Sequence, residues 1–172
     1  MTHVIYLSLG SNLGERRQFL RRALDALPPE VRVLRVSPLY ETAPWGYTEQ
    51  ADFLNIAVLA ESELEPQLLL KHIKSIEKRT GREASFRLGP RQIDIDILFY
   101  DALMFEKGAL TIPHPRLHER AFVLVPLAEL APDLRQPQLG KTIAELLAER
   151  PNWTETVRKI NEADWYENPA DQ

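Results

Sequence analysis

The sequence contains no cysteine. Disulfide bridges, thiolate metal ligands and a cysteine nucleophile are therefore excluded. It also has no apolar run near the roughly 18 residues that a membrane-spanning helix needs. The first twelve residues, MTHVIYLSLGSN, lack the basic start and the long apolar stretch of a signal peptide. We therefore expect a cytoplasmic protein with no membrane partner.

An excess of positive charge is also lacking. The chain has 21 Lys and Arg against 25 Asp and Glu, a net charge of −4. Binding to nucleic acid needs clustered positive charge, so we expect no nucleic-acid partner, although a small phosphorylated ligand needs only a local basic pocket. The phosphate-binding pattern G-x-x-x-x-G-K-[ST] is absent too. With 172 residues, 44% of them hydrophobic, the chain predicts one domain over 1–172, expected to be a monomer.

Hydrophobic periodicity predicts an alternation of strands and helices. The strands are expected at 3–9, 31–37, 52–61, 92–100 and 110–112, and the first two helices at 14–27 and 66–80. Residues 41–51 are too rich in Pro, Gly and polar residues for regular structure. Further helices are expected at 121–130, 141–150 and 153–163. This order favours an α+β fold, a ferredoxin-like sandwich with an antiparallel sheet, helices packed on one of its faces, and a C-terminal helical extension over about 135–172.

The stretch RLGPRQIDIDIL, residues 87–98, places two aspartates on one predicted strand. Strand side chains alternate between faces, so Ile93, Ile95 and Ile97 are expected in the core and Asp94 and Asp96 on the opposite face. Two carboxylates arranged in this way suit a hard cation such as Mg²⁺. The alternative is that the two aspartates form the solvated face of an amphipathic strand. Taken without its neighbours, the aspartate pair favours this alternative.

Basic residues surround this acidic pair. Arg82, Arg87 and Arg91 lie within ten positions of one another, and guanidinium groups match the geometry of phosphate. His114 stands between Pro113 and Pro115, which stiffen its backbone. Each of these residues could instead be solvated or structural. Together with the aspartates, they supply the ligands that a metal-bound nucleotide requires.

Four segments identify a resemblance: GSNLG at 10–14, YETAPWGYTEQADFLNIAV at 40–58, GPRQIDIDIL at 89–98 and IPHPRLHERAFVLVPLAELAP at 112–132. On these segments the chain resembles the 6-hydroxymethyl-7,8-dihydropterin pyrophosphokinases of folate biosynthesis, from residue 4 to about 134. The resemblance implies that the substrates are ATP and 6-hydroxymethyl-7,8-dihydropterin. ATP gives its pyrophosphoryl unit to the pterin hydroxymethyl group and AMP leaves. The resemblance also implies Mg²⁺ as cofactor, with two ions expected alongside ATP.

The resemblance further implies roles for matched positions. Asp94 and Asp96 would hold the metal, and with Arg82 and Arg91 they would form the catalytic set. The residues implied in pterin binding are Asn12, Thr42, Ala43, Trp45, Phe53, Asn55 and Phe122. Those implied in ATP binding are Lys74, Glu77, Arg82, Arg87, Arg91, Ile97, Thr111, His114 and Arg120. Phe53 and Phe122 could stack on the flat pterin ring, although the sequence alone favours ordinary core residues.

The chain departs from the family in the loop after Arg82. That loop is about one residue short, with Ala84 and Leu88 where the family usually has arginine and tryptophan. The loops at 10–15, 43–51 and 82–90 are expected to be mobile and to close over bound substrates. Two other classes stay open: a ferredoxin-like binding module for RNA, and a metal-dependent phosphohydrolase that uses the same aspartates.

Overall fold

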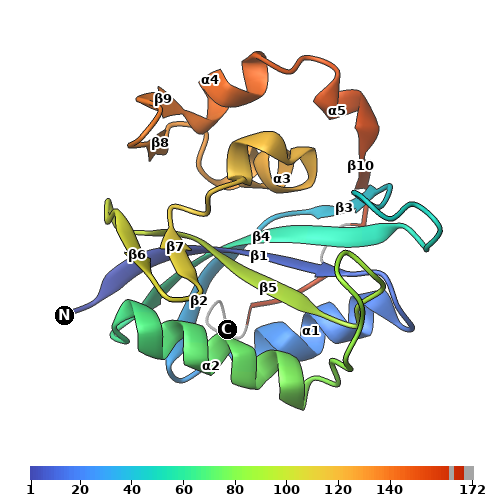
Figure 1. Ribbon diagram of the computed structural model, residues 1–172, viewed down its shortest axis with the longest axis horizontal. Helices are drawn as coiled ribbons and strands as arrows, with labels where there is room; N and C mark the ends of the chain where they lie inside the picture. The colour runs from blue at the N-terminus through green and yellow to red at the C-terminus, as the bar shows by residue number, and fades with distance from the viewer. Residues whose placement is uncertain (163–164, 169–172) are drawn as a thin grey trace.

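The computed structural model describes residues 1–162 and 165–168 as layers around one antiparallel sheet (Figure 1). In chain order the elements are β1 (His3–Ser11), α1 (Arg16–Ala26), β2 (Val31–Val36), β3 (Leu39–Thr42), β4 (Phe53–Ser62), α2 (Pro66–Arg79), β5 (Asp94–Tyr100), β6 (Phe105–Lys107), β7 (Leu110–Ile112), the 3₁₀ turn η1 (Leu117–Glu119), α3 (Ala121–Leu130), β8 (Arg135–Gln136), β9 (Lys141–Thr142), α4 (Ile143–Ala148), α5 (Trp153–Thr156) and β10 (Val157–Ile160). Among the described residues, no helix combines the length and the apolar character needed to cross a membrane.

The main sheet has the strand order β10-β3-β4-β1-β5, and β2 also pairs with β4. Both β2 and β3 pair antiparallel with β4, β2 against Val58–Ser62 and β3 against Phe53–Asn55. They therefore act as one bent strand, interrupted at Ser37 and Pro38. With that pair counted once, the order is that of the predicted ferredoxin-like α+β sandwich. The prediction of irregular structure from residue 41 is wrong at its start, because β3 continues to Thr42.

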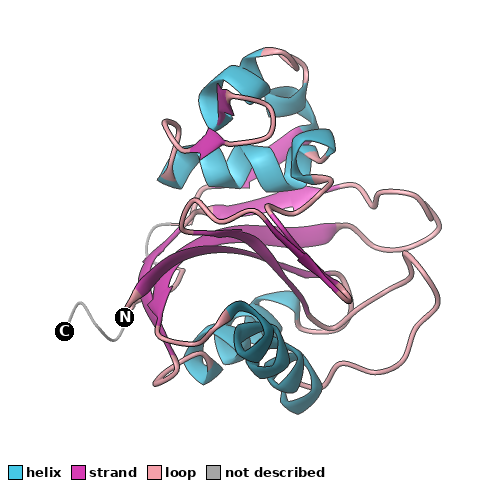
Figure 2. Ribbon diagram, turned by 60° about the vertical axis from the view of Figure 1, so that its left-hand side comes forward, coloured by secondary structure: helices cyan, strands magenta, loops and turns pink. Residues whose placement is uncertain are grey.

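Helices cover both faces of the sheet (Figure 2). On one face α1 and α2 pack as predicted, and the apolar stripe of α2, formed by Leu69, Ile73 and Ile76, is fully buried. On the other face α3 packs Leu124 and Leu127 into a second apolar cluster. The expectation of helices on one face alone is therefore wrong. The consequence for function is that the α3 face of the sheet is partly enclosed.

Strand β5 confirms the predicted alternation in its first half. Ile95 and Ile97 are buried in the core under α1 and α2, while Asp94 and Asp96 lie on the α3 face. The register against β1 then shifts, because Tyr6 pairs with Phe99 and Leu7 with Ile97. Leu98 is the extra residue of this bulge. The bulge places Leu98 and Phe99 together in the apolar cluster beneath α3, so the polar part of this face is confined to the start of β5.

The C-terminal part is only partly helical, so the predicted helical extension is wrong in detail. The helix expected at 141–150 begins at Ile143, after β9, where Thr142 and Glu145 form a capping box. The helix expected at 153–163 ends at Thr156 and continues as β10, which pairs antiparallel with β3. The β-branched Val157 and Ile160 suit a strand, and β3 offers a free edge. Residue 163 of that predicted helix lies outside the described residues.

Candidate active site

An open cavity lies between the α3 face of the sheet and two long loops. It encloses about 630 Å³, including the solvent at its mouth. Its lining comes from four strands, the two loops and the beginning of α3: Ser8, Gly10, Thr42, Ala43, Trp45, Phe53, Asn55, Leu88, Gly89, Arg91, Asp94, Asp96, Arg120 and Phe122. The structure thus brings together ten of the predicted site residues, from segments far apart in the sequence.

One half of this cavity is aromatic and neutral, with the rings of Trp45, Phe53 and Phe122 in its lining. Asn55, which is buried, donates from Nδ2 to Thr42 Oγ1 at 2.8 Å. A Cβ atom at Gly10 would lie 2.8 Å from Asn55 Oδ1, so glycine on β1 leaves room for this amide. The aromatic half of the cavity therefore combines flat apolar surfaces with an oriented amide, and this arrangement suits a planar heterocycle.

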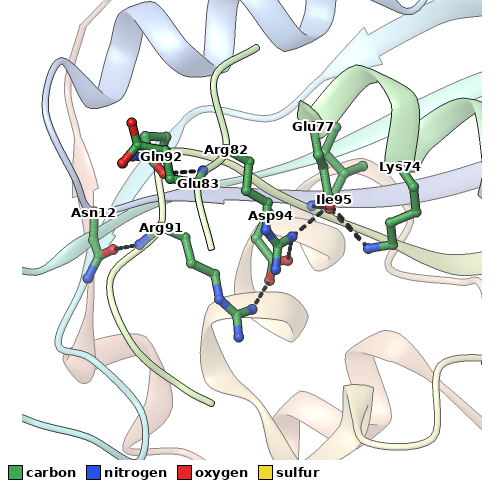
Figure 3. Close-up of polar contacts among 9 residues, drawn as sticks. All are labelled: Asn12, Lys74, Glu77, Arg82, Glu83, Arg91, Gln92, Asp94 and Ile95. Carbon is green, nitrogen blue, oxygen red and sulfur yellow. Dashed lines mark hydrogen bonds and ion pairs between the residues drawn. The ribbon is translucent and has the colours of Figure 1, made fainter. Parts of the chain in front are cut away.

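The other half of the cavity is charged and centres on Asp94 (Figure 3). Arg82 Nη1 donates to Asp94 Oδ1 at 2.9 Å, and Arg91 Nη1 donates to Asp94 Oδ2 at 3.1 Å. Arg82 Nη1 also donates to Glu77 Oε2 at 2.7 Å. Glu77 is buried and accepts from the Ile95 N–H at 2.8 Å and from Lys74 at 3.1 Å. This network fixes Arg82 between α2 and β5.

Asp96 lies beside this network on the same strand face. Burial, together with the negative charge of Asp94, raises the pKa of Asp96 to about 6, although the positive charges of Lys74 and Arg120 oppose the shift. A cation would relieve this repulsion, and carboxylate oxygens suit Mg²⁺. Within residues 1–162 and 165–168, no three His, Asp or Glu side chains gather as a metal-binding group. A pair of carboxylates fits a metal that takes its other ligands from phosphate and water.

Arg120 joins the two halves of the cavity. Its guanidinium carbon lies 5.4 Å from the centre of the Trp45 ring and 5.7 Å from that of Phe122. The guanidinium of Arg116 reaches the same Trp45 ring at 5.9 Å. These cation–π contacts hold the loop that carries Trp45 against the beginning of α3.

His114 follows the cis peptide bond at Pro113, and its N–H donates to Leu98 O at 3.0 Å. Its Nδ1 accepts from the Arg116 N–H at 3.2 Å, so Nε2 carries the proton of the neutral ring. Burial, together with the positive charge of Arg120, lowers the pKa of His114 from 6.5 to about 4. The imidazole is therefore a neutral hydrogen-bond donor at physiological pH.

The low pKa of His114 leads to a testable prediction about the pH dependence of stability. Below pH 6.5 the unfolded chain takes up a proton at His114 that the folded chain does not, so the free energy of unfolding falls until the pH reaches about 4. We expect the NMR signals of the His114 ring to titrate near pH 4. The variant His114→Asn should lose this part of the pH dependence. A titration midpoint near 6.5 would contradict the burial of the ring.

The three loops predicted to close over the site contact one another. Asn12 Nδ2 donates to Gln50 Oε1 and to Ala51 O, and Asn12 Oδ1 accepts from the Arg91 N–H at 2.8 Å. Gln50 Nε2 in turn donates to Leu88 O at 2.7 Å. Asn12 is therefore a buried residue that connects the loops by hydrogen bonds, and it does not line the cavity. Since β1 extends to Ser11, the first loop begins two residues later than predicted.

Some predicted residues lie elsewhere. Ile97 is buried in the core, Thr111 lies on β7 and Arg87 is exposed on the loop 82–90. Conversely, sequence reasoning missed Ser8 and Gly10, which pair with Asp96 and Asp94 across β1 and β5. Small residues at alternate positions of an otherwise apolar strand were the available signal.

Paired carboxylates, guanidinium groups and an adjoining aromatic pocket on an α+β sheet define an enzyme that transfers phosphoryl groups. The family model described as 7,8-dihydro-6-hydroxymethylpterin-pyrophosphokinase (HPPK) matches residues 6–132. The chain belongs to this family, whose members are pyrophosphokinases of folate biosynthesis, and it shares that activity.

Individual relatives agree with this assignment, and a solved structure agrees with the fold. The 2-amino-4-hydroxy-6-hydroxymethyldihydropteridine pyrophosphokinase of Methylorubrum extorquens is 48% identical over 145 residues, which are 83% of this chain and 90% of the relative. The enzyme of that name from Aquifex aeolicus is 39% identical over 145 residues, 84% of this chain and 91% of the relative. A crystal structure of Plasmodium falciparum HPPK-DHPS with pterin and p-hydroxybenzoate superposes with a TM-score of 0.74 at 18% identity. It covers 93% of this chain, which spans only 48% of that one, and it supports the fold alone.

Proposed function

We propose that the two halves of the cavity bind the two substrates of the pyrophosphokinase reaction. The pterin ring would lie in the aromatic half, between Phe53 and Phe122, with its polar edge towards Asn55 and Thr42. The triphosphate of ATP would lie in the charged half. The observation that carries this proposal is that one cavity joins both halves, so that the pterin hydroxymethyl group and the phosphates would meet beside Asp94 and Asp96.

Asp94 and Asp96 would hold Mg²⁺, with two ions expected when ATP is bound. Bound there, Mg²⁺ supplies charge neutralisation to the phosphates and polarises the attacking hydroxyl group. The contribution of Arg82 and Arg91 is orientation, since their guanidinium forks can grip phosphate oxygens in line with the hydroxyl. Trp45, Ala43 and the loop around them would exclude water from the transfer.

The remaining ATP contacts are proposed around the charged half. The side chains proposed to approach the nucleotide come from α2, from the third loop and from the region of β7 and α3. They are Lys74, Arg87, Thr111, His114 and Arg120. Glu77 would act through Arg82, because its carboxylate is already engaged with that residue, with Lys74 and with the Ile95 N–H.

Backbone groups at the outer edge of β5 are a further source of contacts. The Ile95 N–H points outward to Glu77, and Ile97 lies two residues further along the same strand. Its side chain is buried, so its contact would be through the main chain. We also propose that the enzyme is a single-domain monomer and that it is cytoplasmic. Asn12 would organise the loops beside the pterin.

Product analysis tests the reaction directly. The protein is incubated with Mg²⁺ and ATP, with and without 6-hydroxymethyl-7,8-dihydropterin, and nucleotide products are separated by chromatography. The proposal expects AMP only when the pterin is present. Release of phosphate from ATP alone would indicate a hydrolase, and the absence of any product would leave a binding module.

Phe122 tests the location of the pterin. Phe122→Ala removes one stacking surface, so pterin binding should weaken by about 1–3 kcal/mol, the scale of lost burial and stacking. ATP binding should barely change, because the charged half keeps its residues. Calorimetric titration with each ligand is the measurement. Equal weakening of both ligands would show that Phe122 is structural and that the pterin lies elsewhere.

A further inference from the structure

Glu41 on β3 joins three elements through its carboxylate. Arg16, at the start of α1, approaches Glu41 Oε2 at 2.8 Å, and Arg158 of β10 donates to Glu41 Oε1. The Glu41 side chain is only 16% exposed. Burial alone would raise the pKa of Glu41, but hydrogen bonds and charge from the two arginines outweigh it and lower the pKa overall. The carboxylate is therefore ionised at neutral pH and bound on both sides.

Arg16 also reaches the far end of the loop that follows Glu41. Its Nη1 donates to the carbonyl oxygen of Asp52 at 2.9 Å. Glu41 lies next to the start of the loop 43–52, and Asp52 is its last residue. Thr42 and Phe53, the residues on either side of the loop, are paired across β3 and β4. One guanidinium group thus holds both ends of the loop that lines the aromatic half of the cavity.

Strand β10 supports the same place from outside. In the β10–β3 ladder Arg158 lies opposite Glu41, and the buried Val157 lies opposite Thr42. This strand follows the 6–132 region that matches the family model. The C-terminal segment is therefore connected to the cavity lining by one ladder and one ion pair.

We propose that Glu41, held by Arg16 and Arg158, is a positioning residue for the ring-binding half of the cavity, and that β10 acts on substrate binding through it. This role rests on the proposed assignment of that half to the pterin ring. Glu41 is not among the lining residues, so it acts by fixing the ends of the loop and with them Thr42 and Phe53. The charged half is held by its own network around Asp94, in which Glu41 takes no part.

The test compares Glu41→Gln with a matched control, Glu61→Gln. Glu61 is also paired with an arginine, Arg32, across two strands of the same sheet, but away from the cavity lining. For Glu41→Gln we expect pterin affinity to fall about three- to tenfold, the scale of a small, partly exposed ion-pair network, while the affinity for Mg²⁺ and ATP stays within about twofold. Amide hydrogen exchange at 42–52 should become faster. The control should change none of these.

The partner arginine supplies a second arm. Arg158→Gln should lower pterin affinity as Glu41→Gln does, and Arg158→Lys should lower it less. When Arg158→Gln and Glu41→Gln are combined, the loss of pterin affinity should be smaller than the sum of the two single losses. If Glu41→Gln binds pterin like the wild type, or weakens both ligands equally, the positioning role is overturned, whatever happens to the melting temperature. If the wild type itself fails to bind pterin, the assignment of the pocket is wrong. That outcome overturns this role as well and is seen before any variant is made.

Discussion

Asp96→Asn should abolish turnover and leave the fold intact. The substitution keeps the shape of the side chain but removes one of the two carboxylates that would hold Mg²⁺. It also removes the repulsion between Asp94 and Asp96 that helps to raise the pKa of Asp96, so the melting temperature should stay equal or rise. Steady-state assays of AMP formation and thermal unfolding are the two measurements.

The control for this variant is Asp133→Asn. Asp133 is exposed in the loop between α3 and β8 and lies outside the cavity, so its variant should keep wild-type activity. Near-normal turnover of Asp96→Asn at ordinary Mg²⁺ concentrations would contradict the metal assignment. Lost turnover together with a large drop in melting temperature would mean that Asp96 serves the fold.

Arg91→Ala should lower kcat on the order of 100-fold while weakening ATP binding much less. The Arg91 guanidinium lies 3.1 Å from Asp94 in the charged half of the cavity, where the proposed transfer would take place. An interaction formed mainly in the transition state acts on kcat, and single preorganised donors contribute about 100- to 1,000-fold. The backbone N–H of residue 91, which binds Asn12, survives the substitution. The loops should therefore keep their contacts.

Single-turnover kinetics and calorimetry with ATP separate these effects. Arg91→Lys keeps the charge but loses the fork, so it should fall between the wild type and the alanine variant. Arg79→Ala, at the exposed end of α2, is the matched control and should behave like the wild type. Weaker ATP affinity with an unchanged kcat would show that Arg91 only binds the nucleotide.

Local patterns in the sequence predicted the central part of the fold. The alternation of isoleucine and aspartate in β5 and the apolar stripe of α2 report which face of an element is buried, so both could be read without the structure. The same local reasoning failed for β10. Its four residues form a strand because β3 has a free edge nearby, and such a pairing between distant segments leaves only a weak trace in periodicity.

The candidate site shows the same division. Asp94, Arg91 and the aromatic residues were predicted from motifs, and the structure places them around one cavity. The burial of Glu77 beneath Arg82 and the bonds from Asn12 to two other loops depend on how the segments assemble in space. Leu88 lines the cavity, and a Cβ atom at Gly46 would lie 2.4 Å from its Cδ1. Gly46 also has a φ of +84°, which favours glycine, and neither feature can be predicted from composition alone.

The pairing of Asp94 with Arg82 and Arg91 means that the protein carries its own counter-ions. A carboxylate already neutralised by the chain does not need a metal in order to be folded, in contrast to structural zinc sites. If Mg²⁺ binds at Asp94 as proposed, it would replace the guanidinium groups as counter-ions, and those groups would then need an anion of their own. The phosphates of ATP would supply that anion, so metal and nucleotide should bind far more tightly together than either does alone.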